Sequence, residues 1–279
     1  MTFAPVIPIG GAAGLGFLDR TYDRQFAQFN RSPEIARDLA HFADVAGGIE
    51  TAADLVQDTR ALRVALGAFG LEDELPKRAF IRKVLEEGTL DRTSLANRLQ
   101  DPAWRKFSEA MGFGDFGGLL KLTAVRERTA EQYRVRQFER AVGDRDVSMR
   151  LALNFRREIG EIANSESVDR TGWFRIMGSR PLREVVEGAL GLPGQFGTMD
   201  IDQQREELEG RARRQLGEAS PAVFRDPEVV ETMVRRFLVR AQIESGPSPT
   251  TPGMAALTIL QSSGLGGAAR GNLFASNFL

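Results

Sequence analysis

One four-residue pattern occurs three times in the chain: a small residue, a large apolar residue, a glycine and a second large apolar residue. The copies are AFGL at 68–71, AMGF at 110–113 and ALGL at 189–192. Each copy follows a stretch whose apolar residues recur at helical spacing. Glycine just beyond a helix adopts a left-handed backbone conformation without a Cβ clash, and the next apolar residue packs back onto the last turn. The pattern therefore predicts three helix ends in an all-α chain.

Matching helix starts precede several of these segments. Asp-Pro pairs at 101–102 and 226–227 and a Ser-Pro pair at 32–33 are typical of an N-cap residue followed by proline in the first turn. The segment Ser179-Arg180-Pro181 is a looser version of this start.

The segments 60–71, 102–113 and 181–192 align without gaps, and 227–238 follows the pattern without its glycine. We interpret this as a short helical unit used about four times, with 60–113 and 180–238 as a weak internal duplication. The alternative, that capped amphipathic helices resemble one another through physics alone, stays open.

Periodicity predicts helices along nearly the whole chain, because few β-branched or alternating stretches compete. The predicted fold class is all-α, a multi-helix orthogonal bundle with a flexible N-terminal arm and C-terminal tail. The expected helices are 17–30, 33–46, 51–69, 76–87, 91–99, 102–111, 123–142, 145–164, 180–190, 200–216 and 227–244.

The polar stretch ANSESVDRTG at 163–172 is the best candidate for a domain boundary or a long loop. A Pro/Ser/Thr/Gly linker follows from Ser245, and the apolar segment 254–260 behind it could dock into a partner groove or fold back on the same chain. The predicted organisation is a flexible arm at 1–16, an N-terminal helical half at 17–165, a C-terminal helical half at 173–244, and a linker with a flexible tail at 245–279.

The residue types present exclude several kinds of site. The 279 residues include no cysteine and one histidine, His41, so disulfides, cysteine-ligated metals and a two-histidine zinc site cannot be formed by one chain. A net charge of −1 argues against a general nucleic-acid binder. The N-terminus lacks the basic region of a secretory signal, and no apolar run approaches the roughly 18 residues of a membrane span. We expect synthesis in the cytosol.

Three short motifs resemble known sites, and each has a structural interpretation that fits better. GGAAGLG at 10–16 lacks the spacing and lysine of a phosphate loop, and GFGDFGG at 112–118 lacks the other motifs of a kinase and predicts a tight turn with Phe113 and Phe116 in the core. DIDQQREE at 200–207 predicts a helix N-cap rather than a calcium loop. His41 is expected at the edge of the core. The sequence therefore predicts no catalytic, cofactor-binding or metal-binding residue, and no cofactor.

The segment 121–157 is rich in arginine, with ten basic against five acidic residues and with Tyr133 and Phe138 between them. Such a segment could present a surface for an acidic partner or for nucleic acid. The favoured interpretation is a pair of solvated helix faces with i,i+4 ion pairs.

A family resemblance emerges from LRVALGAFGLEDELPKRAFIRKVLEEGTLDRTSLANRLQDPAWRKFSEAMGFGDF at 62–116, together with QYRVRQFERAVG, WFRIMGSRPLREV and ALGLPGQFGTMDIDQQ further on. Over roughly 15–244 the chain resembles the domain of unknown function 1217 family. The resemblance implies an alphaproteobacterial protein whose gene lies among flagellar genes. It implies no catalytic activity, ligand or functional residue for these positions.

These observations favour a non-enzymatic, flagellum-associated structural or accessory protein of the hook–basal body that acts by protein–protein docking. Export by the flagellar type III route, with ordering of the arm 1–16 and the tail after 245, belongs to this hypothesis, and its partners would be flagellar proteins. The alternative is a cytoplasmic assembly factor, export chaperone or motility regulator. A third hypothesis is an enzyme of unfamiliar type that uses a carboxylate pair in a cleft. The oligomeric state is not predicted.

Overall fold

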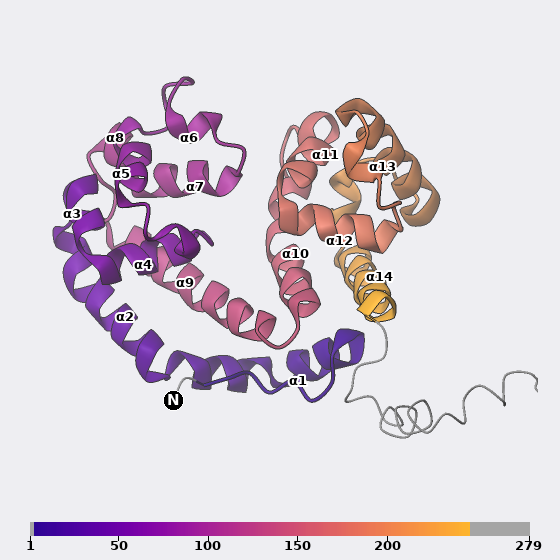
Figure 1. The fold of residues 1–279 in the computed structure, drawn as a ribbon, viewed down its shortest axis with the longest axis horizontal. Helices are drawn as coiled ribbons and strands as arrows, with labels where there is room; N and C mark the ends of the chain where they lie inside the picture. Colours follow the sequence, from indigo (N-terminus) through magenta and orange to yellow (C-terminus); the bar gives the residue numbers. More distant parts are fainter. Residues whose placement is uncertain (1–2, 246–279) are drawn as a thin grey trace, which may run out of the picture.

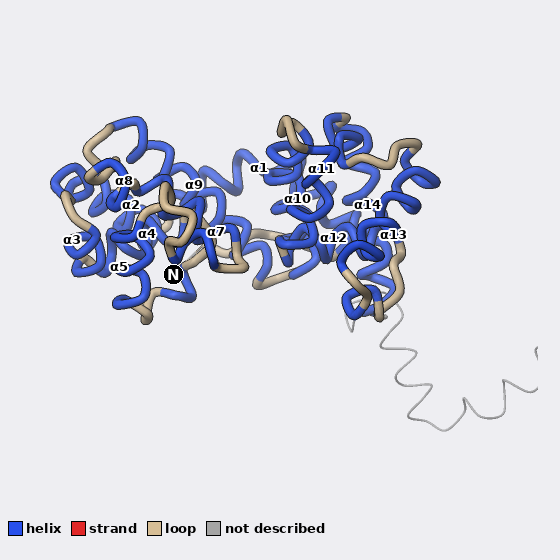
Figure 2. Tube along the Cα trace, turned by 90° about the horizontal axis from the view of Figure 1, so that it is seen from above, coloured by secondary structure: helices blue, strands red, loops and turns tan. Residues whose placement is uncertain are grey.

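The computed structural model describes residues 3–245, and all regular structure in that range is helical (Figures 1 and 2). This confirms the predicted all-α, multi-helix fold. Four short 3₁₀ helices lie between the α-helices: η1 (Ala46–Gly48), η2 (Glu72–Glu74), η3 (Phe196–Thr198) and η4 (Pro221–Arg225). The α-helices are α1 (Gly11–Asn30), α2 (Pro33–Val45), α3 (Ala52–Gln57), α4 (Thr59–Gly67), α5 (Arg78–Glu87), α6 (Leu95–Arg98), α7 (Pro102–Met111), α8 (Phe113–Phe116), α9 (Thr123–Gly143), α10 (Val147–Ala163), α11 (Val168–Gly178), α12 (Arg180–Leu190), α13 (Ile201–Leu216) and α14 (Pro227–Ser245).

The helices form two groups that α1 joins along one side (Figure 1). Helices α2 to α9 make the first lobe and α10 to α14 make the second, and both views show the groups apart (Figures 1 and 2). Helix α1 contacts α2 and α9 in the first lobe and α10 and α14 in the second. The chain reverses between α9 and α10, and these two helices pack against each other. The lobes are therefore held together by α1 and by the α9–α10 pair.

The three repeated glycines end helices as the sequence predicts. Gly70, Gly112 and Gly191 all have φ between 64° and 78°. The N–H of Leu71 donates to the carbonyl of Leu66 at 2.9 Å, and the corresponding bond from Leu192 to Glu187 is 3.0 Å. These are the six-residue closures of a Schellman motif. The third copy makes the simpler closure, from Gly112 N–H to the Ser108 carbonyl at 2.9 Å.

The predicted helix starts are confirmed where an aspartate precedes the proline. Asp101 Oδ1 accepts from the Ala103 N–H at 2.9 Å, and Asp226 Oδ1 accepts from the Glu228 N–H at 2.8 Å. Ser32 precedes α2, but its hydroxyl donates to the Phe29 carbonyl at 2.6 Å instead of capping the helix. The Ser32 hydroxyl thus has its partner in the turn before α2, which the Ser-Pro pattern alone does not reveal.

Apolar side chains from both lobes and from α1 form one continuous core. At the point where α1 crosses α9, Tyr22, Phe26 and Phe29 surround the buried ring of Phe138, with ring centroids 5.3 to 5.5 Å apart. Edge-on aromatic contacts of this kind add to the stabilisation from burial. Helix α1 is thus fixed to the first lobe by an aromatic cluster.

The N-terminal segment differs from the prediction, because α1 begins at Gly11 rather than at 17. Residues 3–10 precede it, and Val6 exchanges two backbone hydrogen bonds with the Gln25 side chain, at 2.7 and 3.2 Å. The Gly11 N–H donates to Asp146 Oδ2 at 3.0 Å. The described part of the predicted arm is therefore packed on the helical body. The alanine and leucine residues between the glycines of 11–16 favour a helix. The number of glycines in this segment led to the prediction of a flexible arm instead.

Two other segments correct the predicted helices. The single helix expected at 51–69 breaks at Asp58, whose carboxylate accepts from the Arg60 and Ala61 N–H groups and caps α4. The stretch 163–172, predicted as a loop or boundary, contains the first turns of α11, which packs on α10, α12 and η4. Phe113 packs against the core as expected, but Phe116 is 55% exposed, so its predicted burial is wrong.

The order of elements is similar in the two lobes. In the first lobe α4, η2, α5, α6 and α7 follow one another, and in the second lobe α12, η3, α13, η4 and α14 do. The two orders differ at the fourth element, α6 against η4, and the duplication of 60–113 and 180–238 stays a prediction. The predicted halves 17–165 and 173–244 divide inside the second lobe, since α10 packs with α11, α12 and α14. The linker and tail after Ser245, including 254–260, lie outside the described residues.

Candidate functional site: the charged cleft between the lobes

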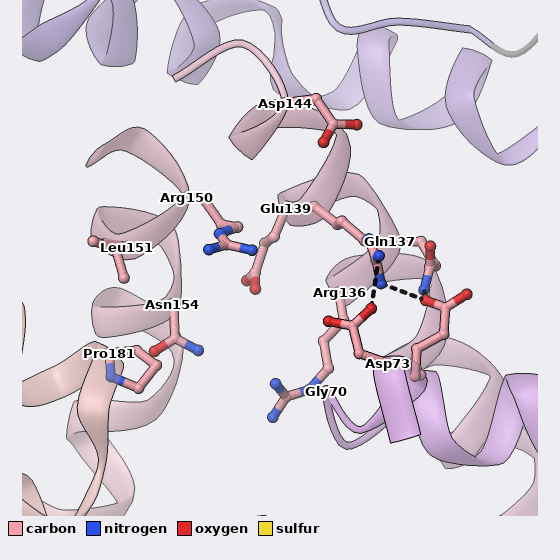
Figure 3. Close-up of a pocket in the computed structure, with 13 residues that line it drawn as sticks. Gly70, Asp73, Arg136, Gln137, Glu139, Asp144, Arg150, Leu151, Asn154 and Pro181 are labelled. Atoms are coloured by element: carbon pink, nitrogen blue, oxygen red, sulfur yellow. Dashed lines mark hydrogen bonds and ion pairs between the residues drawn. The ribbon is translucent and has the colours of Figure 1, made fainter. Parts of the chain in front are cut away.

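A cavity of about 350 Å³ lies between the two lobes. Its first-lobe wall is built from the end of α4, from η2 and from α9, and its second-lobe wall from α10 and the start of α12 (Figure 3). Gly67 and Gly70 lie on the first-lobe wall and Pro181 on the second. The repeated glycine pattern therefore contributes one edge of the cleft.

Ion pairs join α9 to α10 beside this cavity. Glu139 is buried and accepts two hydrogen bonds from Arg157, at 2.8 and 3.0 Å. Arg157 also contacts Glu158 at 2.9 Å, and Arg136 donates to the same carboxylate at 2.7 Å. Two-pronged guanidinium–carboxylate contacts are among the stronger side-chain hydrogen bonds. The helix pair that joins the lobes is thus held by a charged network as well as by apolar packing.

Within this network, two arginines hold the carboxyl group of Glu158 in its ionised form. Burial would raise the pKa of Glu158, but Arg136 and Arg157 hold that pKa below its ordinary value. Burial lowers the pKa of Arg136, and the neighbouring Arg157 lowers it further, against the opposing effect of Glu158. A general acid needs a raised carboxyl pKa, so Glu158 has the opposite character.

A second set of ion pairs lies at the η2 edge of the cleft. Arg140 contacts Glu72 at 3.1 Å and Asp73 at 2.9 Å, and Gln137 donates to Glu72 at 2.5 Å. Figure 3 shows Asp73 and Gln137 on the first-lobe side of the cavity. They connect α9 to the segment that follows the AFGL pattern.

A smaller cavity of about 150 Å³ continues between the lobes, with Pro102 and Lys106 on one side and Leu182 on the other. Lys106 of α7 contacts Glu161 of α10 at 2.6 Å, and Arg175 of α11 contacts the same carboxylate at 2.9 Å. Both charged and apolar side chains therefore line the space between the lobes.

Two polar side chains of the cleft wall have no partner among the described residues. Asn154 is 9% exposed, and its Oδ1 is buried without a hydrogen bond. Arg150, one turn earlier on α10, is exposed and forms no ion pair within residues 3–245. The sequence analysis counted Arg150 only as one of the basic residues of 121–157, and it missed Asn154. The available signal was the asparagine inside the apolar run LALNF at 151–155.

The residues considered from the sequence lie elsewhere and have structural contacts. His41 Nε2 lies 2.7 Å from Asp58 Oδ2, beside the cap of α4. Burial opposes ionisation of Asp58, but the Ala61 N–H and His41 hold its pKa below the ordinary value. Asp115 accepts from the Thr89 N–H at 2.8 Å and its hydroxyl at 2.9 Å, so the DFG segment fixes a turn. Asp200 caps α13, as predicted.

The arginines of 121–157 are more strongly paired than the segment itself suggests. Only the Glu131–Arg134 pair, at 3.0 Å, lies within the segment at helical spacing. Arg140 and Arg156 instead contact acids from other elements, such as Asp19 at 2.8 Å and Glu231 at 2.5 Å for Arg156. Distant acidic residues therefore neutralise much of the local positive charge.

No group of three or more histidine, aspartate or glutamate side chains within residues 3–245 is arranged to hold a metal ion. Within the same range, no helix is both long and apolar enough to span a membrane.

The fold and the cleft define a class of two-lobed, all-α proteins in which one long helix joins the lobes. The chain matches the family model described as "Protein of unknown function (DUF1217)" over residues 68–230, and it belongs to this family. A crystal structure of an Agrobacterium tumefaciens protein, determined by a structural genomics consortium, has a TM-score of 0.70 and 22% identity. The match covers 87% of this chain and 100% of that one, and it shows the shared fold. Comparison with curated proteins gives no match.

Proposed function

We propose that this protein is a non-enzymatic structural or accessory component of the flagellar hook–basal body and that it acts by docking to other flagellar proteins. The support from the sequence is the family resemblance, which implies a flagellar gene neighbourhood. The support from the structure is a set of four exposed apolar side chains near the place where α1 begins, α10 begins and α14 ends. Three of the four carboxylates that line the cleft, Glu72, Asp73 and Glu139, are held in ion pairs, which favours a structural role over acid–base chemistry.

The exposed surface lies where three helix ends meet. The Gly11 N–H at the start of α1 contacts Asp146 just before α10, and a Cβ added to Gly11 would lie 2.7 Å from Gln242 Oε1 near the end of α14. Four large apolar side chains next to these contacts are exposed. We call them the junction patch: Ile9, Val147, Val239 and Ile243.

Exposed apolar residues are ordinary singly, but a group of four at one junction is typical of a contact surface. Ile243 is 73% exposed and is two residues from the end of the described chain. Burying such side chains against a partner would contribute about 1.5 kcal/mol or more each. The occupant that this proposal commits to is a subunit of the hook–basal body.

The packing of residues 3–16 changes one part of the sequence hypothesis. A free N-terminal arm that orders on assembly is not available in the described range, because Val6 and Gly11 already have partners. Docking through the preformed junction patch does not require such ordering. It is the simpler mechanism for this fold.

The test is the location of the tagged full chain in its host, compared between cytosol, purified hook–basal bodies and culture medium, with and without the flagellar export ATPase. We expect ATPase-dependent recovery in the basal-body fraction. Retention in the cytosol of both strains would contradict the proposal and favour the alternative of an export chaperone or motility regulator.

Two matched variants test the patch. Ile243→Asp places a charge in the junction patch and should reduce recovery with basal bodies by about tenfold. Leu90→Asp is the control, because Leu90 is similarly exposed, at 71%, and lies on the first lobe away from the patch. Equal recovery of the Ile243→Asp variant and the unaltered chain would exclude the patch as the docking surface.

A further inference from the structure

The unpartnered pair on α10 marks a binding site inside the cleft. Arg150 and Asn154 are four residues apart on one helix and lie on the same face of it. Figure 3 shows both side chains directed toward α9, across the cavity from Glu139 and Arg136. The Asn154 amide is nine-tenths buried, and no described residue hydrogen-bonds to it. The atom buried without a hydrogen bond is Oδ1, and Nδ2 donates to no described residue. Buried carboxamide groups nearly always have a partner, so the Nδ2 donor is available to an occupant of the cavity.

The groups offered to that occupant are mainly hydrogen-bond donors. A guanidinium carries five N–H donors and no acceptor, and the carboxamide adds two more. In Figure 3 the amide nitrogen of Asn154 faces the cavity, while its oxygen lies toward Pro181, which has no N–H to donate. The methylene stem of Arg150 is close to Gly143, where an added Cβ would lie 2.5 Å from Arg150 Cδ. The absence of a side chain at Gly143 therefore leaves space for the arginine to lie against the wall.

The surrounding charges decide which anion fits. Glu72, Asp73, Glu139 and Asp144 also line the cavity. Arg140 pairs with Glu72 and Asp73, and Arg157 pairs with Glu139. Within the lining, Arg150 is the cation and Asp144 the acid that form no ion pair with a described residue. Because the lining carries four carboxylates, a doubly charged phosphate is repelled more strongly than a singly charged anion. A carboxylate carries one charge and two coplanar oxygens, which match the flat guanidinium.

We propose that Arg150 and Asn154 bind a carboxylate group in the cleft between the lobes. One carboxylate oxygen, or both, accepts from the Arg150 guanidinium, and an oxygen accepts from Asn154 Nδ2. The cavity volume of about 350 Å³ falls in the range of small-ligand pockets and admits a free carboxylic acid or an acidic side chain of a second protein. This inference does not depend on the proposed flagellar role.

The test follows the side-chain NH₂ signals of Asn154 in nuclear magnetic resonance spectra of the ¹⁵N-labelled full chain, assigned with the Asn154→Ala variant. Sodium acetate, succinate, phosphate and chloride are titrated separately at constant ionic strength. A blocked peptide Gly-Glu-Gly and its glutamine counterpart form a second arm. The expected result is a saturable shift with acetate, succinate and the glutamate peptide, and none with chloride or the glutamine peptide.

The two arms distinguish the sources of the carboxylate. Saturation by succinate at a lower concentration than by the glutamate peptide assigns the site to a free acid, and the reverse order assigns it to an acidic protein partner. No saturable shift with any carboxylate, or a shift of equal strength with phosphate, overturns the proposal.

Variants confirm which groups bind. Arg150→Gln should weaken the carboxylate response at least about tenfold, since it removes a charge-assisted hydrogen bond. Arg145→Gln is the control, because Arg145 is exposed, precedes α10 and does not line the cavity. Arg150 is exposed, so its replacement leaves the fold intact, as circular dichroism would verify. An unchanged response in the Arg150→Gln variant also overturns the assignment.

Discussion

The effect of replacing Gly67 depends on one neighbouring side chain, the ring of Tyr133. Alanine normally stabilises a helix interior relative to glycine by about 1 kcal/mol. A Cβ at this position of α4 would lie 2.7 Å from Tyr133 Cδ2, and that ring is buried and hydrogen-bonded to Asp38 at 3.1 Å. We expect Gly67→Ala to lower the free energy of unfolding by about 1–3 kcal/mol, as overpacking does. Urea denaturation measures it.

The matched control is Gly160→Ala in α10, where no heavy atom lies within 4 Å of the added Cβ. This change should be neutral or stabilising by about 0.5–1 kcal/mol. If both variants shift stability in the same direction, the contact with Tyr133 does not determine the result.

Residues with local roles could be predicted from the sequence, and residues with distant partners could not. Gly70, Gly112 and Gly191 end helices because of their immediate neighbours, and the prediction was confirmed at all three. The Oδ1 atom of Asn154 is buried without a hydrogen bond. Arg150 forms no ion pair with a described residue, whereas Arg140 and Arg157 pair with acids. No spacing rule contains that information.

At the scale of elements, periodicity locates most helices but not the contacts between them. The break between α3 and α4 was missed because Asp58 fits a helical pattern while its carboxylate caps the next helix. Helix α11 was absent from the expected helices, because its polar first turn resembles a loop. The pairing of α9 with α10 was visible only as arginine enrichment in 121–157.

The α9–α10 pair gives the fold a dependence on pH. The pKa of Glu158 lies below its ordinary value of 4.5, so its contribution to stability is complete above that pH and is lost as the pH falls through the lowered pKa. We expect Glu158→Gln to lower the free energy of unfolding at neutral pH by about 1–3 kcal/mol and to flatten its decline in acid. Urea denaturation between pH 3 and pH 7 would test this.

The control for this change is Glu131→Gln, which removes an exposed partner of Arg134 on the same helix pair. Exposed ion pairs contribute about 0–1 kcal/mol, so little effect is expected. An unaltered acid dependence in the Glu158→Gln variant would show that the stability of the α9–α10 pair does not rest on this carboxylate.

For the whole molecule, the sequence predicted helical halves but not the arrangement of the lobes. That arrangement depends on α1, whose first turns touch the second lobe while its later turns pack around Phe138 of the first. The glycine-rich start of α1 resembled a flexible arm because glycine is usually a helix breaker. Here close approach requires it, since a Cβ at Gly14 would overlap the Ile9 carbonyl oxygen and lie 3.3 Å from Met149 Sδ.

The two tryptophans test whether α1 couples the lobes, because Trp104 lies in α7 of the first lobe and Trp173 in α11 of the second. Single-tryptophan forms made with Trp104→Phe or Trp173→Phe should report coincident urea transitions. Gly14→Ala should displace the start of α1 from α10 and move the Trp173 transition to lower urea than the Trp104 transition. Gly16→Ala, whose nearest atom is Arg20 Nη1 at 3.7 Å, should keep them coincident. Coincident transitions in the Gly14→Ala chain would mean that the α9–α10 pair alone couples the lobes.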